Sequence, residues 1–220
     1  MVQSIQAKHW DDVYNNTPLD SIPWELDWAN NALVSWMSTQ SGITTALEIG
    51  CGTGINSIWL SQQGIAVTGI DVATNAIQQS QDRARACGVD VNFQVADILN
   101  LSLALPKFDL VFDRACFHVL HFKEDQQKFV RVVENLLTPH GRWVSIIGST
   151  ENQHSVDSST RWQTPRRTLV DIAQAVEPSL KIDSLHAIQE QHKNGNYHPF
   201  WMMVASKRST PALVSSHANK

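Results

Sequence analysis

Residues 46–54 read Ala46-Leu47-Glu48-Ile49-Gly50-Cys51-Gly52-Thr53-Gly54, an apolar run that passes directly into three alternating glycines. The apolar run predicts a buried strand, and helical spacing begins at Ile55. Glycine lets the backbone turn sharply and approach a bound nucleoside closely, where a Cβ atom would collide with the ligand. This stretch therefore predicts a strand, a ligand-binding turn and a helix, in that order.

The same turn disfavours a dinucleotide site. A dinucleotide fingerprint is written GxGxxG and would need a small residue at position 55, where this chain has Ile55. Glu48 lies just before the turn, and a carboxylate there would attract a cationic amino acid ligand and repel a pyrophosphate. An NAD-dependent oxidoreductase therefore stays as an alternative that these two residues disfavour.

Three later strands end in acidic residues. Asp71 lies 21 positions after Gly50, close to the spacing at which an acid accepts hydrogen bonds from ribose hydroxyls. Asp97 precedes Ile98, a pair suited to the adenine amine and ring, and Asp113 ends a further strand. Because parallel strands end at one edge of a sheet, these residues are expected in one crevice. Singly, the turn could be a plain tight connection, and Asp71 or Asp97 a helix cap.

Short apolar runs alternate with helical segments along most of the chain, as in a parallel sheet covered by helices on both faces. Near the C-terminus Asn194-Gly195 favours a hairpin between two strand-like runs. We therefore predict an α/β, Rossmann-like seven-strand sheet, mostly parallel with an antiparallel C-terminal strand. The expected strands are 45–49, 66–70, 91–95, 108–112, 143–147, 181–188 and 200–206, and the expected helices are 26–39, 55–63, 73–87, 124–137 and one from Thr168.

Composition limits the possible functions. The 220 residues, 42% hydrophobic and 17% charged, suit one folded domain over 1–208, with an N-terminal helical lid over about 1–40 and a disordered tail at 209–220. A net charge of -4 gives no general basic field, so no nucleic acid partner is expected. No apolar run has membrane-spanning length, and we expect a cytoplasmic monomer or weak homodimer. The three cysteines lack CxxC spacing, which favours reduced thiols.

Over residues 10–207 the chain resembles a class I S-adenosylmethionine-dependent methyltransferase. The stretch Asp113-Arg114-Ala115-Cys116-Phe117-His118 is similar to the Asp-Arg-Gly stretch of the thiopurine S-methyltransferase family, with Ala115 in place of glycine. The early aromatics and the Pro-Trp-acid triplet at 23–25 resemble small-thiol and halide methyltransferases, whose N-terminal aromatics cover the cofactor, although the insertion at 18–22 departs from the plant spacing. The resemblance implies the cofactor S-adenosyl-L-methionine, bound by Trp10, Tyr14, Trp24, Glu48, Gly50, Cys51, Gly52, Asn56, Asp71, Val72, Asp97, Ile98 and Asp113.

Candidate catalytic residues follow from the chemistry of methyl transfer. In-line displacement from a sulfonium depends on alignment and exclusion of water, so no base is obligatory. A cation would raise the thiolate fraction of a thiol acceptor, and Arg114 is the first candidate, with a structural pairing to an acid as the alternative. Unperturbed histidine titrates near neutral pH, so His118 and His121 are candidate proton acceptors, although simple packing or exposure is the plainer interpretation of at least one of them. No metal is predicted, because no further ligands accompany this histidine pair.

The acceptor is expected to be a small molecule, most simply a thiol or a related sulfur, selenium or tellurium nucleophile. Arg161, Arg166 and Arg167 occur in or beside the polar stretch 149–165, an expected mobile loop after the fifth strand. They could bind an anionic or sulfur substrate, or simply form a solvated basic stretch at the start of a helix. A small-molecule O- or N-methyltransferase and a non-catalytic cofactor-binding regulatory protein remain alternatives.

Overall fold

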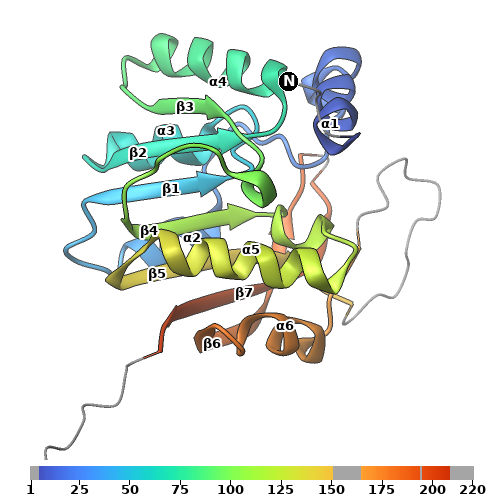
Figure 1. Ribbon diagram of the computed structural model, residues 1–220. Coiled ribbons are helices and arrows are strands. Elements are labelled where there is room, and N and C mark those ends of the chain that lie inside the picture. The colour runs from blue at the N-terminus through green and yellow to red at the C-terminus, as the bar shows by residue number, and fades with distance from the viewer. Residues whose placement is uncertain (1–4, 151–164, 194, 209–220) are drawn as a thin grey trace, which may run out of the picture.

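The computed structural model describes residues 5–150, 165–193 and 195–208, and its centre is a single sheet of seven strands (Figure 1). The strand order is β3-β2-β1-β4-β5-β7-β6. The first five strands are parallel, and β7 runs antiparallel to both of its neighbours. The predicted fold class is confirmed. The strands are β1 Thr45–Ile49, β2 Ala66–Asp71, β3 Asn92–Val95, β4 Phe108–Arg114, β5 Leu137–Gly148, β6 Leu180–Gln191 and β7 Tyr197–Lys207.

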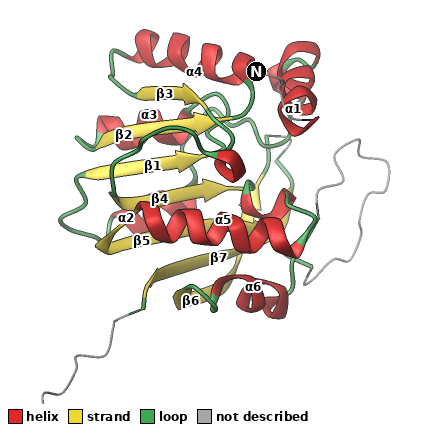
Figure 2. Ribbon diagram, in the orientation of Figure 1, coloured by secondary structure: helices red, strands yellow, loops and turns green. Residues whose placement is uncertain are grey.

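Helices cover both faces of this sheet (Figure 2). Residues of α5 and α6 pack in one apolar cluster with one face of the sheet, and residues of α2 and α3 pack in another with the opposite face. Helix α1 lies against α4 beside the carboxyl ends of the strands (Figure 1). The helices are α1 Ile5–Asn16, α2 Asn31–Met37, α3 Ile55–Gln62, α4 Thr74–Cys87, α5 Lys123–Leu136 and α6 Leu169–Val176, and the short 3₁₀ turns are η1 Leu19–Ser21, η2 Ile98–Asn100 and η3 Phe117–Val119.

The residue pattern explains why these elements pack as layers. In β4, Leu110 and Phe112 face the cluster of α2 and α3, whereas Val111 between them faces the cluster of α5 and α6. In α5, buried Phe129, Val130 and Val133 recur at the spacing of one helical face. Strands buried on both sides need apolar residues at successive positions, which is why the central strands were recognisable as continuous apolar runs.

The N-terminal region differs most from the prediction. Helical spacing over 26–39 predicted one helix, but α2 begins only after Asn30, whose side chain accepts a hydrogen bond of 3.0 Å from the Leu33 amide. Residues 22–30 instead form an irregular segment that includes the buried Ile22, Leu26 and Asn30. The apolar residues of this segment therefore do not form one helical face, because Leu26 is buried whereas Trp28 is exposed.

The C-terminal hairpin is confirmed as predicted. Strands β6 and β7 pair antiparallel from Leu180↔Lys207 to Gln191↔Tyr197, and Gly195 in the turn has a φ of 84°. The disordered tail expected at 209–220 and most of the mobile loop expected at 149–165 fall outside the described residues. Within the described part of the chain, the helices are too short or too polar to cross a membrane.

Candidate functional site

The glycine turn joins β1 to α3 at the carboxyl edge of the sheet. Gly50, Gly52 and Gly54 have φ angles of 68°, 52° and 83°, in the left-handed region that favours glycine. The Gly50 amide donates to the Ile70 carbonyl at 2.8 Å, and the Gly52 amide donates to Asp71 Oδ2 at 3.0 Å. The end of β2 therefore fixes the shape of the turn.

The three glycines serve different purposes. A Cβ atom at Gly54 would lie 2.6 Å from the ring of Phe93, so this glycine is needed for packing between α3 and β3. A Cβ atom at Gly52 would lie 2.7 Å from the Tyr14 hydroxyl, and one at Gly50 would lie 2.9 Å from Cys116. The prediction of bare backbone at the turn is thus refined, because side chains of α1 and of the segment after β4 cover part of it.

Two cavities meet at this turn. A cavity of about 310 Å³ lies beside α1, at the carboxyl ends of β1, β2 and β4 and next to the β6–β7 turn. A smaller one of about 40 Å³ shares Tyr14, Trp24, Gly50 and Arg114 with it. Of the predicted site residues, the larger cavity is lined by Trp10, Tyr14, Trp24, Gly50, Asp71, Val72, Ile98, Arg114 and His118, and the smaller also by Glu48, Cys51, Gly52 and Asn56.

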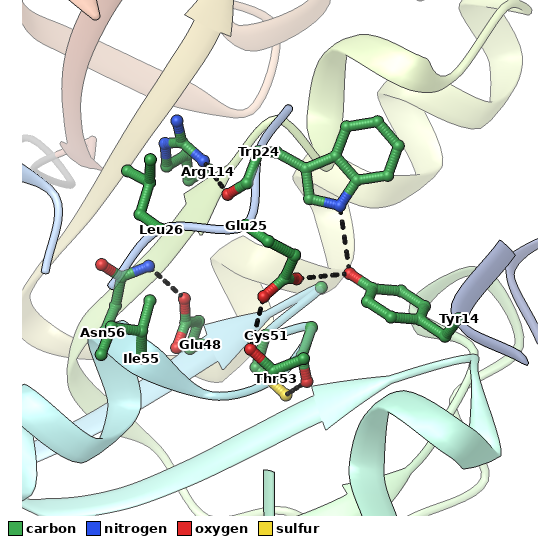
Figure 3. Close-up of a pocket in the computed structure, with 12 residues that line it drawn as sticks. Tyr14, Trp24, Glu25, Leu26, Glu48, Cys51, Thr53, Ile55, Asn56 and Arg114 are labelled. Carbon is green, nitrogen blue, oxygen red and sulfur yellow. Dashed lines mark hydrogen bonds between the residues drawn. The ribbon is translucent and has the colours of Figure 1, made fainter. Parts of the chain in front are cut away.

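A chain of hydrogen bonds crosses the smaller cavity (Figure 3). Trp24 Nε1 donates to the Tyr14 hydroxyl at 3.1 Å, which in turn donates to Glu25 Oε1 at 3.1 Å. Thr53 Oγ1 donates to the other oxygen of Glu25 at 2.5 Å. Burial, with the charges of Glu25 and Asp71, raises the Tyr14 pKa well above its usual value, so its hydroxyl stays protonated. The irregular segment 22–30 is thereby tied to the glycine turn.

Glu48 is buried at the end of β1 and lines the smaller cavity. Its carboxylate accepts hydrogen bonds from Asn56 Nδ2 at 2.8 Å and from the Ser57 hydroxyl. Burial raises the pKa of Glu48 to about 7, and these two donors hold it lower than burial alone would. A cationic ligand group in the cavity would stabilise the ionised form of this carboxylate.

Arg114 has a structural partner, the alternative raised from the sequence. Its Nε donates to Glu190 Oε2 of β6 at 2.9 Å, and the side chains of the two residues are only 8% and 5% exposed. Arg114 Nη1 also donates to the Trp24 carbonyl at 2.9 Å. Because its charge is neutralised by a buried carboxylate, Arg114 contributes little net positive charge to the cavity that it lines. The role of Arg114 as the cation that activates a thiol remains a prediction, and its pairing with Glu190 disfavours that role.

His118 lies in η3 and lines the larger cavity. The Gly148 amide donates to its Nδ1 at 2.7 Å, so the neutral ring carries its proton on Nε2. Burial and then the charges of Arg167 and Arg166 lower the His118 pKa to about 3. This geometry favours a role for His118 Nε2 as a hydrogen-bond donor and disfavours the predicted role of His118 as a proton acceptor. His121, the second residue of the predicted pair, is exposed.

Asp97 and Asp113 line neither cavity. Asp97 caps η2, because its Oδ1 accepts from the Leu99 amide at 2.9 Å. Asp113 is fully buried, and it accepts from the Phe117 amide and from Trp143 Nε1, both at 2.9 Å. Both predicted cofactor ligands therefore accept hydrogen bonds from the protein itself. For Asp97 this is the helix-cap role that the sequence left open as an alternative.

Several cavity residues were not predicted as site residues. Glu25 is the acid of the Pro-Trp-acid triplet and was not predicted to bind a ligand, yet its carboxylate lies over the glycine turn. His192 and His198 line the larger cavity and were missed entirely. The two histidines lie on either side of the Asn-Gly turn. The predicted hairpin could therefore have indicated that they lie close together. Arg166, one of the three arginines that the sequence offers as substrate ligands, lines the same cavity, whereas Arg161 lies outside the described residues.

The comparisons with known proteins agree with this architecture. Residues 46–141 match a family model described as a methyltransferase domain. The ubiquinone biosynthesis O-methyltransferase of Bordetella parapertussis is 29% identical over 143 residues, which are 64% of this chain and 56% of that protein. The Coxiella burnetii protein of the same name is 29% identical over 96 residues, 44% of this chain and 40% of that protein. The chain thus spans about half the length of the curated relatives it matches.

Solved structures show the same fold. The N-methyltransferase NodS of Bradyrhizobium japonicum, in complex with S-adenosyl-L-homocysteine, superposes with a TM-score of 0.70 at 19% identity, covering 94% of this chain and 100% of that one. A second solved structure, which concerns the conversion of a disulfide bond into a thioacetal group during echinomycin biosynthesis, superposes with a TM-score of 0.79 at 20% identity. The match covers 91% of this chain and 92% of that one. Residues 46–141 are therefore similar to a methyltransferase domain, and the chain has the fold of the solved N-methyltransferase NodS.

Proposed function

We propose that the protein transfers the methyl group of S-adenosylmethionine to a small-molecule acceptor. The observation that carries this proposal is the left-handed glycine turn with Asp71 beside it, both on the wall of a 310 Å³ cavity in a methyltransferase domain. Nucleoside-binding α/β folds hold their ligand at this edge of the sheet. When bound, the cofactor supplies a methyl group activated on a positively charged sulfur.

The residues around the two cavities fit such a cofactor. Asp71 keeps acceptor capacity for ribose hydroxyls. Its Oδ2 accepts from the Gly52 amide and its Oδ1 from the Ala73 amide, and each carboxylate oxygen can accept more than one hydrogen bond. Val72 and Ile98 give the larger cavity apolar walls suited to an adenine ring. In the smaller cavity, the carboxylates of Glu25 and Glu48 suit a cationic amino group.

The chain contributes orientation and exclusion of water. Trp10, Tyr14 and Trp24 of the N-terminal region line the cavity, and the Trp10 and Trp24 rings meet edge to face at 5.6 Å. Burying the reacting groups under these rings aligns the acceptor with the methyl group and keeps water away from it. No general base is required for an acceptor that is already ionised.

The acceptor atom is a separate question. The curated relatives are named as O-methyltransferases, which favours an oxygen acceptor over the thiol favoured from the sequence. The thiol reading also depended on Arg114 as a cation, and Arg114 is paired with Glu190. An acceptor panel of phenols, amines and thiols with isotopically labelled cofactor distinguishes the three classes. Cofactor binding without turnover across that panel would support the regulatory alternative instead.

Cofactor binding is tested by calorimetry with S-adenosyl-L-homocysteine and with NAD. We expect binding of the former only, and Asp71→Asn should weaken it by about 1 to 3 kcal/mol, because a ribose hydroxyl loses a charged acceptor. Asp90→Asn removes the same charge from an exposed position and should leave the affinity unchanged. Well-folded protein that binds NAD or neither ligand would overturn the proposal.

A further inference from the structure

The two ends of the larger cavity differ in charge. One end, at β2, presents the Asp71 carboxylate beside the glycine turn. The other end, formed by the end of β5 and the β6–β7 turn, presents Arg166, His192 and His198, with His118 nearby. A cavity that is acidic at the cofactor end and basic at the other end favours two ligands of opposite charge.

Arg166 is the residue that gives the second end its charge. Its Nη1 donates to the carbonyls of Ser149 at 3.2 Å and Pro199 at 3.4 Å, and its stem lies close to Gly148. Its guanidinium is half-buried, and within the described part of the chain no carboxylate forms an ion pair with it. This distinguishes it from Arg114, whose charge Glu190 neutralises.

The neighbouring imidazoles add hydrogen-bonding capacity without charge. His192 and His198 stack with ring centroids 4.0 Å apart, and the His192 ring lies 6.4 Å from Phe200. Burial first, and then positive neighbours, lower the pKa of His192 to about 3 and lower that of His198 as well. Among the described residues no three potential metal ligands converge. Together with Phe200 the two imidazoles form an aromatic wall beside Arg166, which has no ion-pair partner among the residues that the structure describes.

We propose that Arg166 selects the methyl acceptor, and that the acceptor carries a carboxylate or comparable oxyanion that binds this guanidinium. The inference rests on the proposed function and names the charge of its substrate. A half-buried guanidinium that forms no ion pair with the described residues gains a charge-assisted hydrogen bond from such a group, whereas a neutral acceptor would leave it without one. The aromatic wall of His192, His198 and Phe200, with the His118 ring 6.1 Å from that of Phe200, fits an acceptor with a flat apolar body.

The test uses the full chain saturated with S-adenosyl-L-homocysteine and two probes of matched shape, 4-fluorobenzoate and 4-fluorobenzamide. Fluorine NMR titration gives the affinity of each probe without any need for turnover. We expect the anionic probe to bind about tenfold more tightly than the neutral one, which is the strength of a charge-assisted contact at a half-buried site. Arg166→Gln should reduce this preference to about twofold or less, with unchanged affinity for S-adenosyl-L-homocysteine.

The matched control is Arg131→Gln, which removes the same charge from an exposed position on α5 and should keep the full preference. Equal binding of both probes to the unsubstituted protein, or an undiminished preference in Arg166→Gln, would overturn the inference. Failure of S-adenosyl-L-homocysteine to bind would instead overturn the proposed function, so the two failures are distinguishable.

Discussion

Three carboxylates are buried where β1, β2 and β4 reach the carboxyl edge of the sheet. Burial raises the pKa of Glu48 to about 7, and the pKa values of Asp71 and Asp113 each to about 6. Each carboxylate accepts hydrogen bonds from neighbouring amides or side chains, which offset part of the cost of removing it from water. Of the three carboxylates, Glu48 and Asp71 line a cavity and can contact a ligand, whereas Asp113 lines neither cavity.

Glu48 makes folding stability depend on pH. Its pKa is raised from 4.5 to about 7 in the folded protein, so its contribution to stability is fully present below pH 4.5 and is lost as pH rises through 7. Glu48→Gln removes this dependence. Between about pH 5 and pH 8 the unfolding free energy of the variant should therefore rise, relative to the unsubstituted protein, by up to about 3 kcal/mol.

Urea unfolding of both proteins at a series of pH values measures this difference. Glu124→Gln, at an exposed position in the first turn of α5, should follow the pH dependence of the unsubstituted protein. Parallel curves for Glu48→Gln and the unsubstituted protein would show that the Glu48 carboxylate is not held protonated by burial.

At the scale of elements, β4 ends in an unusual conformation. Ala115 follows its last residue with a φ of 64°, the sole positive φ among the non-glycine residues that the structure describes. Its amide still donates to the Ile146 carbonyl of β5 at 2.9 Å. The left-handed turn redirects the chain from β4 into η3, which carries His118 to the cavity. Glycine occupies this position in the family stretch that the sequence resembles.

Replacing Ala115 with glycine should stabilise the protein. A side chain in the left-handed region costs about 1 to 2 kcal/mol, and the greater freedom of glycine in the unfolded chain offsets part of the gain. We expect Ala115→Gly to raise the unfolding free energy by about 0.5 to 1 kcal/mol in chemical denaturation. Ala86→Gly, at an exposed position in the last turn of α4, should lower it instead. A loss of stability in Ala115→Gly would contradict the assigned backbone strain.

Sequence pattern predicted the elements that local residues determine. The apolar runs of β1 and β2 and the glycine stop of α4 at Gly88 lie within a residue or two of the prediction. The pairing of Arg114 with Glu190 could not be predicted, because the two residues are 76 positions apart and meet only through the order of the sheet. For the same reason the sequence identified the acid of residues 23–25 without showing that Glu25 contacts Thr53.

At the scale of the molecule, the N-terminal region and the C-terminal hairpin meet over the same edge of the sheet (Figure 1). The side-chain Nδ2 of Asn30 donates to Glu190 Oε2 of β6 at 2.6 Å, and the backbone amide of Asn30 donates to Asn56 Oδ1 of α3 at 2.9 Å. Arg114 joins the same carboxylate to β4. A few buried polar contacts thus connect the segment 22–30 and β6 to the elements that form the cavity.

Among residues 7–16 of α1, the buried side chains are Ala7, Val13 and Tyr14, and the helix packs against α4. We therefore expect α1 to open locally without disrupting the sheet. A ligand in the larger cavity would contact α1 through Trp10 and Tyr14. Saturation with S-adenosyl-L-homocysteine at about a hundredfold excess over Kd should stabilise the whole fold by about 2.7 kcal/mol. Hydrogen exchange should therefore slow globally, with an additional local slowing in α1 and residues 22–30.

Hydrogen exchange measured by mass spectrometry, with and without the ligand, tests this coupling. Tyr14→Phe removes the hydroxyl that links Trp24 to Glu25 and should diminish the local slowing in residues 22–30, because one of the bonds that tie this segment to the turn is lost. Tyr197→Phe, at an exposed position in β7, removes an equivalent hydroxyl and should behave like the unsubstituted protein. Ligand binding that slows exchange uniformly, with no extra effect in α1 or residues 22–30, would show that the N-terminal region does not close over the cofactor.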